Sequence, residues 1–387
     1  MWSNKKILLI DGYARQTLPM AKGFRKLGCY VSTLCFSKLD VGYATKYANK
    51  KILFGVAKDD YDAQLEKVRE ILRTEKYDLV VPMTDYSATY LSKNKQELSK
   101  YAHIAVNDWE TFQLAIDKAR TMKVCADNQI NAPKTLFSNN PLDDIDKSNL
   151  NYPLVVKPKT ACGSIGFNIA ENPQHLRKII DLYPQENGEF FIQEYIPQGG
   201  MSQFGAEVFR DKNGNFSSVL INEKPRWYPI DGGSPTINVA IKNEELVNLS
   251  KKLLDKMNWQ GYANIDFVVD ERDNKFKILE VNGRISAAVK LNYRAGVNIA
   301  QLLLENAFSK SVSILKDYKD GVSVSCCLTE FLWFLKSKKR FKSKPCVFFK
   351  RHNKDVIFSF ADPKPFFAFC LQSIKNYKSA MKKRKRI

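Results

Sequence analysis

Short apolar runs separated by amphipathic stretches make up the first hundred residues of the chain. Three of these runs predict strands, and two amphipathic stretches predict helices. The predicted strands cover residues 7–10, 30–34 and 78–82, and the predicted helices cover residues 18–27 and 61–73. Near-continuous apolar strands that alternate with helices are typical of a parallel sheet covered on both faces. We therefore predict an α/β domain with a parallel sheet over residues 1–108.

The pattern changes after residue 108. Several short segments read as strands, and glycine or Asn-Gly turns separate a number of them. Strands are predicted at residues 153–156, 190–193, 203–209, 217–221, 265–269 and 276–281, and helices at residues 111–128 and 246–257. Tight turns such as Asp211-Lys212-Asn213-Gly214 connect antiparallel strands. We therefore predict an α+β unit with mostly antiparallel sheets over residues 109–308.

Positive charge concentrates in the last part of the chain. The net charge is +20, and residues 310–387 hold 20 Lys and Arg against 5 Asp and Glu. Aromatic runs such as Phe331-Leu332-Trp333-Phe334-Leu335 lie next to these lysines. A helix lying on an anionic membrane combines both features, but a packed subdomain with a basic surface or a nucleic-acid partner also agrees with them. We predict a basic C-terminal extension over residues 309–387 and leave these interpretations open, nucleic acid being the least favoured.

Cysteine and hydropathy patterns bear on the cell compartment. The chain has eight cysteines without a C-x-x-C pair and only three histidines, which favours reduced thiols over disulfides or a structural zinc site. No apolar run is long enough to cross a bilayer, and the run at residues 7–10 is too short for a signal peptide. We expect a cytoplasmic protein, located at the inner face of the membrane if the basic extension binds lipid.

A lysine at the end of a predicted strand precedes a loop that contains glycine. Lys157 ends the strand, and Gly163, Ser164 and Gly166 lie in the loop. Backbone N–H groups next to glycines can approach phosphate oxygens, and the lysine adds compensating charge. An ordinary hairpin with a surface lysine shows the same pattern, so this segment alone leaves both interpretations open.

Oxygen-bearing side chains collect on the last two predicted strands of the α+β unit. Because side chains alternate between the two faces of a strand, Glu280 and Asn282 share one face, and Asp266 lies on the neighbouring strand. Carboxylate and amide oxygens are the hard ligands that Mg²⁺ prefers. Arg284 follows on the same face, where its guanidinium can bind phosphate or carboxylate oxygens with two hydrogen bonds. The pattern predicts a magnesium and phosphate site.

The segments around Lys157, Gln193 and Glu280, in this order, resemble the ATP-grasp superfamily. The resemblance covers about residues 5–308 and is greatest to the branch of carbamoyl-phosphate synthetase and biotin carboxylase. It implies an α/β pre-ATP-grasp domain followed by an ATP-grasp domain. It also implies ATP and two Mg²⁺ ions as cofactors, with Mn²⁺ as an alternative cation.

The resemblance extends to single positions that contact the nucleotide. It implies two phosphate-binding lysines, a glycine loop that closes over the phosphates, a hinge that receives the adenine mainly through backbone groups, and a glutamate facing the ribose. In chain order these positions are Lys118, Lys157, Gly163, Ser164, Gly166, Gln193, Glu194, Tyr195, Ile196 and Glu207.

The resemblance likewise implies metal-binding and catalytic roles. Asp266 and Glu280 match metal ligands, with Glu280 bridging two ions and Asn282 holding the second. Arg284 matches the residue that steadies an acyl-phosphate intermediate, and Lys157 joins it as a catalytic residue.

These roles imply a ligase that activates a carboxylate as an acyl phosphate for an amine or another nucleophile, and releases ADP and phosphate. A phosphoryl transferase on the same fold and a non-catalytic nucleotide-binding scaffold at a membrane are the alternatives. Arg226 lies where such enzymes shape the acceptor pocket, and it either holds a substrate carboxylate or anchors the loop. An amino acid or an envelope glycan is the substrate that we expect. We see no second copy of the motif set and expect neither biotin carboxylation nor carbamoyl phosphate synthesis.

Overall fold

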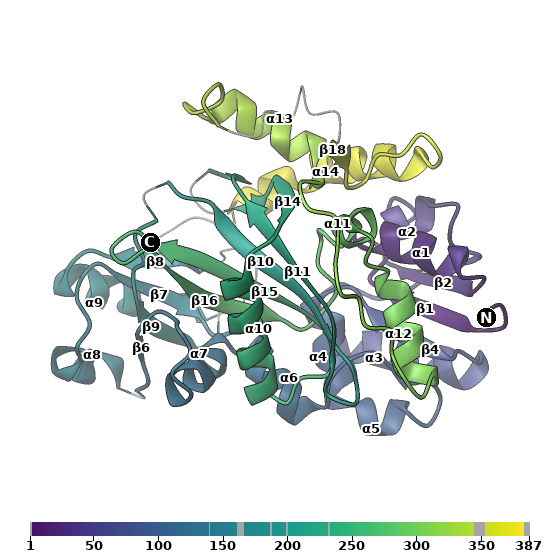
Figure 1. The fold of residues 1–387 in the computed structure, drawn as a ribbon, viewed down its shortest axis with the longest axis horizontal. Helices are drawn as coiled ribbons and strands as arrows, with labels where there is room; N and C mark the ends of the chain where they lie inside the picture. Colours follow the sequence, from purple (N-terminus) through teal and green to yellow (C-terminus); the bar gives the residue numbers. More distant parts are fainter. Residues whose placement is uncertain are drawn as a thin grey trace.

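The computed structural model describes residues 2–138, 140–160, 166–185, 188–198, 200–230, 233–343 and 353–382. Within these ranges the strands form a five-stranded, a four-stranded and a seven-stranded sheet, together with a two-stranded ladder. Figure 1 shows the five-stranded sheet at one end of the molecule, the four-stranded sheet at the other, and the seven-stranded sheet between them.

The first sheet is parallel throughout, as the apolar runs predict. Its strand order is β3-β2-β1-β4-β5. The strands are β1 (Lys6–Ile10), β2 (Tyr30–Cys35), β3 (Lys50–Leu53), β4 (Leu79–Pro82) and β5 (His103–Ile104). The helices of this part are α1 (Thr17–Lys26), α2 (Val41–Ala44), α3 (Tyr61–Thr74), α4 (Asp85–Lys93) and α5 (Lys95–Leu98). Since the chain leaves β1 and β4 in opposite directions, their carboxyl ends form the switch point where α/β sheets bind ligands.

The helix predicted over residues 111–128 is two helices, so this prediction was wrong. They are α6 (Trp109–Ile116) and α7 (Lys118–Asp127), and Asp117 lies between them. The Asp117 carboxylate accepts hydrogen bonds from the backbone N–H groups of Ala119 (2.9 Å) and Arg120 (3.3 Å). An aspartate that caps the first N–H groups begins a new helix. The cap places Lys118 in the first turn of α7.

The four-stranded sheet is antiparallel and has the strand order β6-β9-β7-β8. Its inner face, with Leu154, Val156 and Ile192, packs on Leu176 and Ile179 of a covering helix. The elements are β6 (Thr135–Leu136), α8 (Pro141–Asp144), η1 (Ile145–Lys147), β7 (Leu154–Pro158), β8 (Asn168–Ala170), α9 (Pro173–Asp181) and β9 (Phe190–Glu194).

The seven-stranded sheet has the strand order β16-β15-β10-β11-β14-β17-β18, and all its pairs are antiparallel except β17–β18. The predicted turn at Asp211 joins β10 to β11, and its carboxylate accepts from the N–H groups of Asn213 and Asn215. The strands are β10 (Gln203–Arg210), β11 (Phe216–Lys224), β14 (Ile237–Ile241), β15 (Gly261–Asp270), β16 (Lys275–Asn282), β17 (Ser323–Ser325) and β18 (Asn353–Asp355). Beside them lie β12 (Trp227–Tyr228), β13 (Ser234–Pro235), α10 (Glu244–Lys256), α11 (Lys290–Ala295) and α12 (Ile299–Phe308).

The basic extension is integrated into the folded body. It contributes β17 and β18 to the large sheet, and α13 (Cys327–Lys336) and α14 (Lys364–Lys382) form a layer above β14 and α11 in Figure 1. The Asp362 carboxylate accepts from the Thr45 hydroxyl (2.5 Å), and Gln372 donates to Asp40 (2.7 Å), so the extension also contacts the first domain. The domain boundaries at 108 and 308 stay predictions. Within the described ranges, no helix is both long and apolar enough to span a bilayer.

Candidate active site

The cross-strand register of β15 and β16 brings the predicted metal ligands together. Asp266 pairs with Glu280, and Asn264 pairs with Asn282. Residues directly opposite each other in an antiparallel pair point to the same face. Ile265 lies on the other face in the apolar core and is fully buried. The alternation predicted from sequence therefore produces a polar face with two carboxylates and two amides.

Three cationic side chains surround these oxygens. Lys118, in the first turn of α7, lies 3.4 Å from the Glu280 carboxylate through its Nζ. Lys224, at the end of β11, forms an ion pair with Asp266. Arg284 donates to Oδ1 of Asn282 at 3.2 Å and lies 3.4 Å from Oδ2 of Asp85 at the start of α4. The cluster therefore draws on the antiparallel sheet, on α7 and on the carboxyl edge of the parallel sheet.

Electrostatics connect Lys157 to the same cluster. Burial and, to a smaller extent, the charge of Lys118 lower the pKa of Lys157 to about 8, although Glu280 offsets part of the shift. Burial also acts on Glu280 and raises its pKa, but Lys118, Lys157 and Arg284 outweigh burial and hold this pKa well below its usual range. The single negative charge of Glu280 balances only one of the two lysines, Lys118 and Lys157. A further bound anion would relieve the repulsion that remains between them. The site is suited to a polyphosphate.

Glu207 lies on β10, deeper in the same face. Its side chain is fully buried, and its Oε1 accepts a hydrogen bond of 3.4 Å from the Asn264 amide. Burial raises the pKa of Glu207 to about 7, and Asp266 adds to this effect, while the Ser286 side chain, Lys224 and Arg284 oppose it. Its Oε2 has no hydrogen-bond partner among the described residues. A bound hydroxyl group can satisfy a buried acceptor of this kind. The ribose contact of Glu207 stays a prediction.

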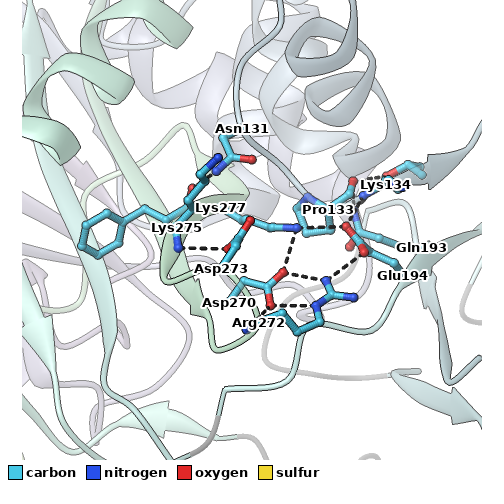
Figure 2. Close-up of polar contacts among 12 residues, drawn as sticks. Asn131, Pro133, Lys134, Gln193, Glu194, Asp270, Arg272, Asp273, Lys275 and Lys277 are labelled. Carbon is cyan, nitrogen blue, oxygen red and sulfur yellow. Dashed lines mark hydrogen bonds and ion pairs between the residues drawn. The ribbon is translucent and has the colours of Figure 1, made fainter. Parts of the chain in front are cut away.

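The predicted adenine hinge lies at the end of β9, next to the β15–β16 hairpin, as Figure 2 shows. The Glu194 carboxylate accepts from the Lys134 backbone N–H (2.8 Å) and forms ion pairs with Arg272 (2.9 Å) and Lys277 (3.2 Å). The Gln193 amide donates to the Thr135 hydroxyl at 2.9 Å. Both side chains are thus engaged by protein groups, and the Glu194 backbone N–H is engaged as well, because it donates to the carbonyl of Lys134 at 2.9 Å.

The remaining hinge and loop positions are placed only in part. Ile196 is buried, and the Tyr195 N–H donates to the carbonyl of Pro153 at 3.3 Å. Gly166 has a positive φ of 68°, a conformation that glycine adopts without strain. The predicted loop residues Gly163 and Ser164 lie outside the described residues.

Arg226 contacts α13 and the segment after it. Its side chain is 4% exposed and its Nε donates to Oε1 of Glu330 on α13 at 2.7 Å. Its guanidinium also lies 4.7 Å from the ring of Trp333, and Nη1 donates to the Ser343 hydroxyl at 3.2 Å. Of the two roles expected for Arg226, the geometry favours the loop anchor over the substrate contact.

The structure adds three residues that the sequence analysis did not assign to the site. Asn264 could have been found, because it lies two positions before Asp266 and alternation puts both on one face. Lys224 and Asp85 carried no such signal. They reach the cluster only because β11 and α4 pack beside it.

The donor set fits a magnesium ion that is shared with a nucleotide. Among the residues that the structure describes, no three His, Cys, Asp or Glu side chains gather into a metal-binding group. Asp266, Glu280 and Asn282 supply two carboxylates and one amide. Mg²⁺ is commonly bound by one or two carboxylates while substrate phosphates and water complete its octahedron. The residues therefore fit magnesium that arrives with ATP.

Solved structures share this architecture. A biotin carboxylase from Campylobacter jejuni, solved as a β-γ-ATP complex, superposes with a TM-score of 0.69 over 83% of this chain and 75% of its own, at 15% sequence identity. At this identity the likeness concerns the fold. Fold and site together define an ATP-grasp enzyme, as the motifs predict.

The sequence profile described as "Carbamoyl-phosphate synthase L chain, ATP binding domain" matches residues 117–314, more than half of the chain, and the chain belongs to this family of ATP-grasp ligases. A D-aspartate ligase from Enterococcus faecium is 26% identical over 289 residues, which is 68% of this chain and 67% of that protein. The N-terminal section of a carbamoyl phosphate synthase large chain from Methanopyrus kandleri is 26% identical over 182 residues, which is 44% of this chain but only 32% of that section.

Proposed function

We propose that the protein is an ATP-dependent ligase that joins a carboxylate to an amine through an acyl-phosphate intermediate. The observation that carries the proposal is the pairing of Asp266 with Glu280 on one face, between Lys118 and Arg284. Phosphoryl transfer between two anions is slow unless their charges are neutralised and their atoms aligned. The site needs no side-chain nucleophile to do both.

The two lysines, the hinge backbone and the arginine each have a role in this scheme. Lys118 and Lys157 hold the phosphates, and the backbone after β9 receives the adenine. Bound magnesium would supply further charge neutralisation at the phosphates. One carboxylate oxygen of the substrate attacks the γ-phosphorus, the bond between that phosphorus and the β-γ bridging oxygen breaks, and ADP leaves. Arg284 stabilises the acyl phosphate until the amine attacks the acyl carbon, after which inorganic phosphate and the amine proton are released.

The comparisons support an amino acid as one partner, since the relative from Enterococcus faecium is a D-aspartate ligase. Asp11 follows β1 and Asp85 begins α4 after β4, so both lie at the switch point of the parallel sheet, where the Thr84 hydroxyl donates to Asp11 at 2.5 Å. Arg284 contacts Asp85, so the proposed acyl phosphate would face this edge. A carboxylate on an envelope glycan is the second substrate class to test.

An ADP-release screen with carboxylates, amines and both together tests the proposal. ADP release that needs both partners supports the ligase, whereas release with the carboxylate alone indicates the phosphoryl transferase. Glu280→Gln should lower ADP release at least about 100-fold, because the variant loses a magnesium ligand and the partner of Lys118. Glu245→Gln, on the exposed face of α10, is the matched control. Equal rates for Glu280→Gln and the parent protein would show that the site is assigned wrongly.

We also propose that the extension lies on an anionic membrane surface, which a second observation favours. Phe367, Leu371 and Ile374 on α14 follow helical spacing and are 62%, 57% and 76% exposed. Phe331 and Leu335 on α13 are likewise exposed, and lysines follow them in the sequence. Exposed apolar side chains beside positive charge are typical of interfacial helices.

Sedimentation with vesicles tests this second proposal. The protein should sediment with phosphatidylcholine vesicles that contain phosphatidylglycerol, and not with phosphatidylcholine alone. Phe367→Asp combined with Leu371→Asp should abolish sedimentation, whereas Leu182→Asp, which changes an exposed leucine after α9, should not. The proposal fails if the double variant sediments as the parent protein does.

A further inference from the structure

A cavity of about 800 Å³ lies between α1, α11 and the segment from Asn353 to Pro365. None of its lining residues belongs to the cluster around Glu280. Gly23 on α1 permits the close approach of α11, since a Cβ at this position would lie 2.9 Å from Cζ of Tyr293. The cavity thus joins the first domain to the extension at a place that the proposed ligase chemistry does not use.

Positive charge lines this cavity. Its walls include five cationic side chains, which come from α1, α11 and β18: Lys22, Lys26, Lys290, Arg294 and Lys354. Two carboxylates also line it, Asp355 and Asp362.

Backbone and hydroxyl donors already occupy both carboxylates. Asp355 accepts from the N–H groups of Cys327 (2.6 Å) and Ile357 (2.8 Å). Asp362 accepts from the Thr45 hydroxyl and from the backbone N–H of Lys46. Neither carboxylate forms a salt bridge with the cavity's cations within the described part of the chain. The cavity thus holds five positive and two negative side chains, an excess of three positive charges, and among the described residues neither carboxylate is paired directly with a cation there.

Two of the cations are held in place by backbone carbonyls. The Lys290 Nζ donates to the carbonyl of Asp355 at 2.5 Å and lies 3.5 Å from that of Phe358. Arg294 donates through Nη1 to the carbonyl of Ser323 at 3.0 Å. Burial lowers the pKa of Lys290 to about 8, and the charges of Lys22, Arg294 and Lys354 contribute, although Asp355 opposes them. Such a group gains its proton most readily when an anion is bound.

Aromatic side chains also line the cavity. Tyr47, Tyr293 and Phe358 line the cavity, and Phe360 beside them is 93% exposed. The Phe358 ring stacks edge-on with Phe360 and with Phe366 of α14, at centroid distances of 4.9 and 5.3 Å. Cationic and aromatic side chains thus line the same cavity.

We propose that this cavity binds the phosphate or diphosphate group of an amphiphilic ligand, with the cations holding the phosphate and the aromatic side chains holding its apolar part. Several lysines around one arginine suit an anion with more than one negative charge, because lysine acts as a point charge and arginine supplies a planar fork. The ligand is either a free phosphorylated compound or the headgroup of a phospholipid. The site is independent of the proposed ligase reaction.

Lysine acetylation followed by mass spectrometry locates the binding. The full-length protein is treated with acetic anhydride alone, with inorganic pyrophosphate, and with vesicles of phosphatidylcholine containing phosphatidic acid. Each ligand that binds should lower the acetylation of Lys22, Lys290 and Lys354 several-fold and leave Lys256, which is exposed on α10, unchanged. Protection by pyrophosphate identifies a free phosphate as a sufficient ligand, whereas protection by the vesicles alone identifies the lipid headgroup. Protection of Lys118 and Lys157 reports the nucleotide site separately.

A matched pair of variants completes the test. Lys22→Gln with Lys354→Gln should weaken binding of the protecting ligand about tenfold or more, since each lost lysine removes a charge-assisted hydrogen bond. Lys178→Gln with Lys256→Gln, at exposed positions of α9 and α10, removes the same charge outside the cavity and the extension and should bind as the parent protein does. Equal loss in both variants, or no protection of Lys290 by either ligand, overturns the proposal. Neither result depends on whether the protein releases ADP.

Discussion

Replacing Arg226 by methionine removes the guanidinium that holds α13 against the loop after β11. The Glu330 side chain is only 5% exposed, and its Oε2 already lacks a partner among the described residues. In Arg226→Met the carboxylate would stay buried without its cation. Removing one partner of a buried ion pair destabilises proteins by about 3–5 kcal/mol. The lost contact with the Trp333 ring adds about 0.5–2 kcal/mol.

A double-mutant cycle separates the ion pair from these other losses. Arg226→Met with Glu330→Leu removes both charges, and apolar replacement of a whole buried pair is often close to neutral. We therefore expect the double variant to recover most of the stability that Arg226→Met loses. Urea unfolding followed by tryptophan fluorescence measures all four proteins, with Arg210→Met as a control, since Arg210 pairs with the half-exposed Asp255.

The same variants distinguish the anchor from the substrate contact. An anchor predicts that Glu330→Leu and Arg226→Met shift the unfolding midpoint together and that the double variant retains ADP release. Suppose instead that Arg226→Met unfolds within about 1 kcal/mol of the parent protein but requires far more carboxylate for half-maximal ADP release. The anchor explanation would then be refuted, and Arg226 would be a substrate-binding residue.

Three further changes test the site and its supports. Lys157→Met removes a buried charge, so it should raise the unfolding free energy of the nucleotide-free protein by about 1–3 kcal/mol at pH 7 and lower ATP affinity at least about 100-fold. The gain in unfolding free energy should fade between pH 8 and 10.5, because in this range Lys157 has lost its proton in the folded protein but not yet in the unfolded chain. Calorimetric titration measures the ATP affinity, and unfolding at several pH values measures the stability. Asp117→Ala removes the cap of α7 and should cost about 1 kcal/mol in urea unfolding while raising the KM for ATP through Lys118, and an unchanged KM would separate the cap from the site. Glu194→Gln weakens the contact to Lys277 and should destabilise the protein by about 1–2 kcal/mol, less at high salt if the pair is electrostatic.

Alternation along two strands was enough to predict the core of the candidate site. Glu280 and Asn282 share a face because side chains repeat every second residue, whatever the rest of the chain does. The parallel sheet followed from runs that are apolar on both faces. These features depend on neighbours within a few residues, which the sequence displays directly.

The register within that pair required the structure. Across β15 and β16, Phe267 pairs with Ile278 while Asp266 pairs with Glu280, so Leu279 has no cross-strand partner. Strict alternation would put Ile278 and Glu280 on one face. The bulge resolves this conflict by burying Ile278 while Glu280 faces Lys118.

Contacts between distant segments were decided by tertiary structure alone. Lys224 reaches Asp266 from another strand, Arg284 reaches Asp85 in the first domain, and Arg226 meets a glutamate 104 residues further along the chain. The type of a charged residue does not reveal whether it binds substrate, metal or another side chain. Its partner depends on which strands pair and which helices pack, and this choice minimises buried, unpaired charge over the whole molecule.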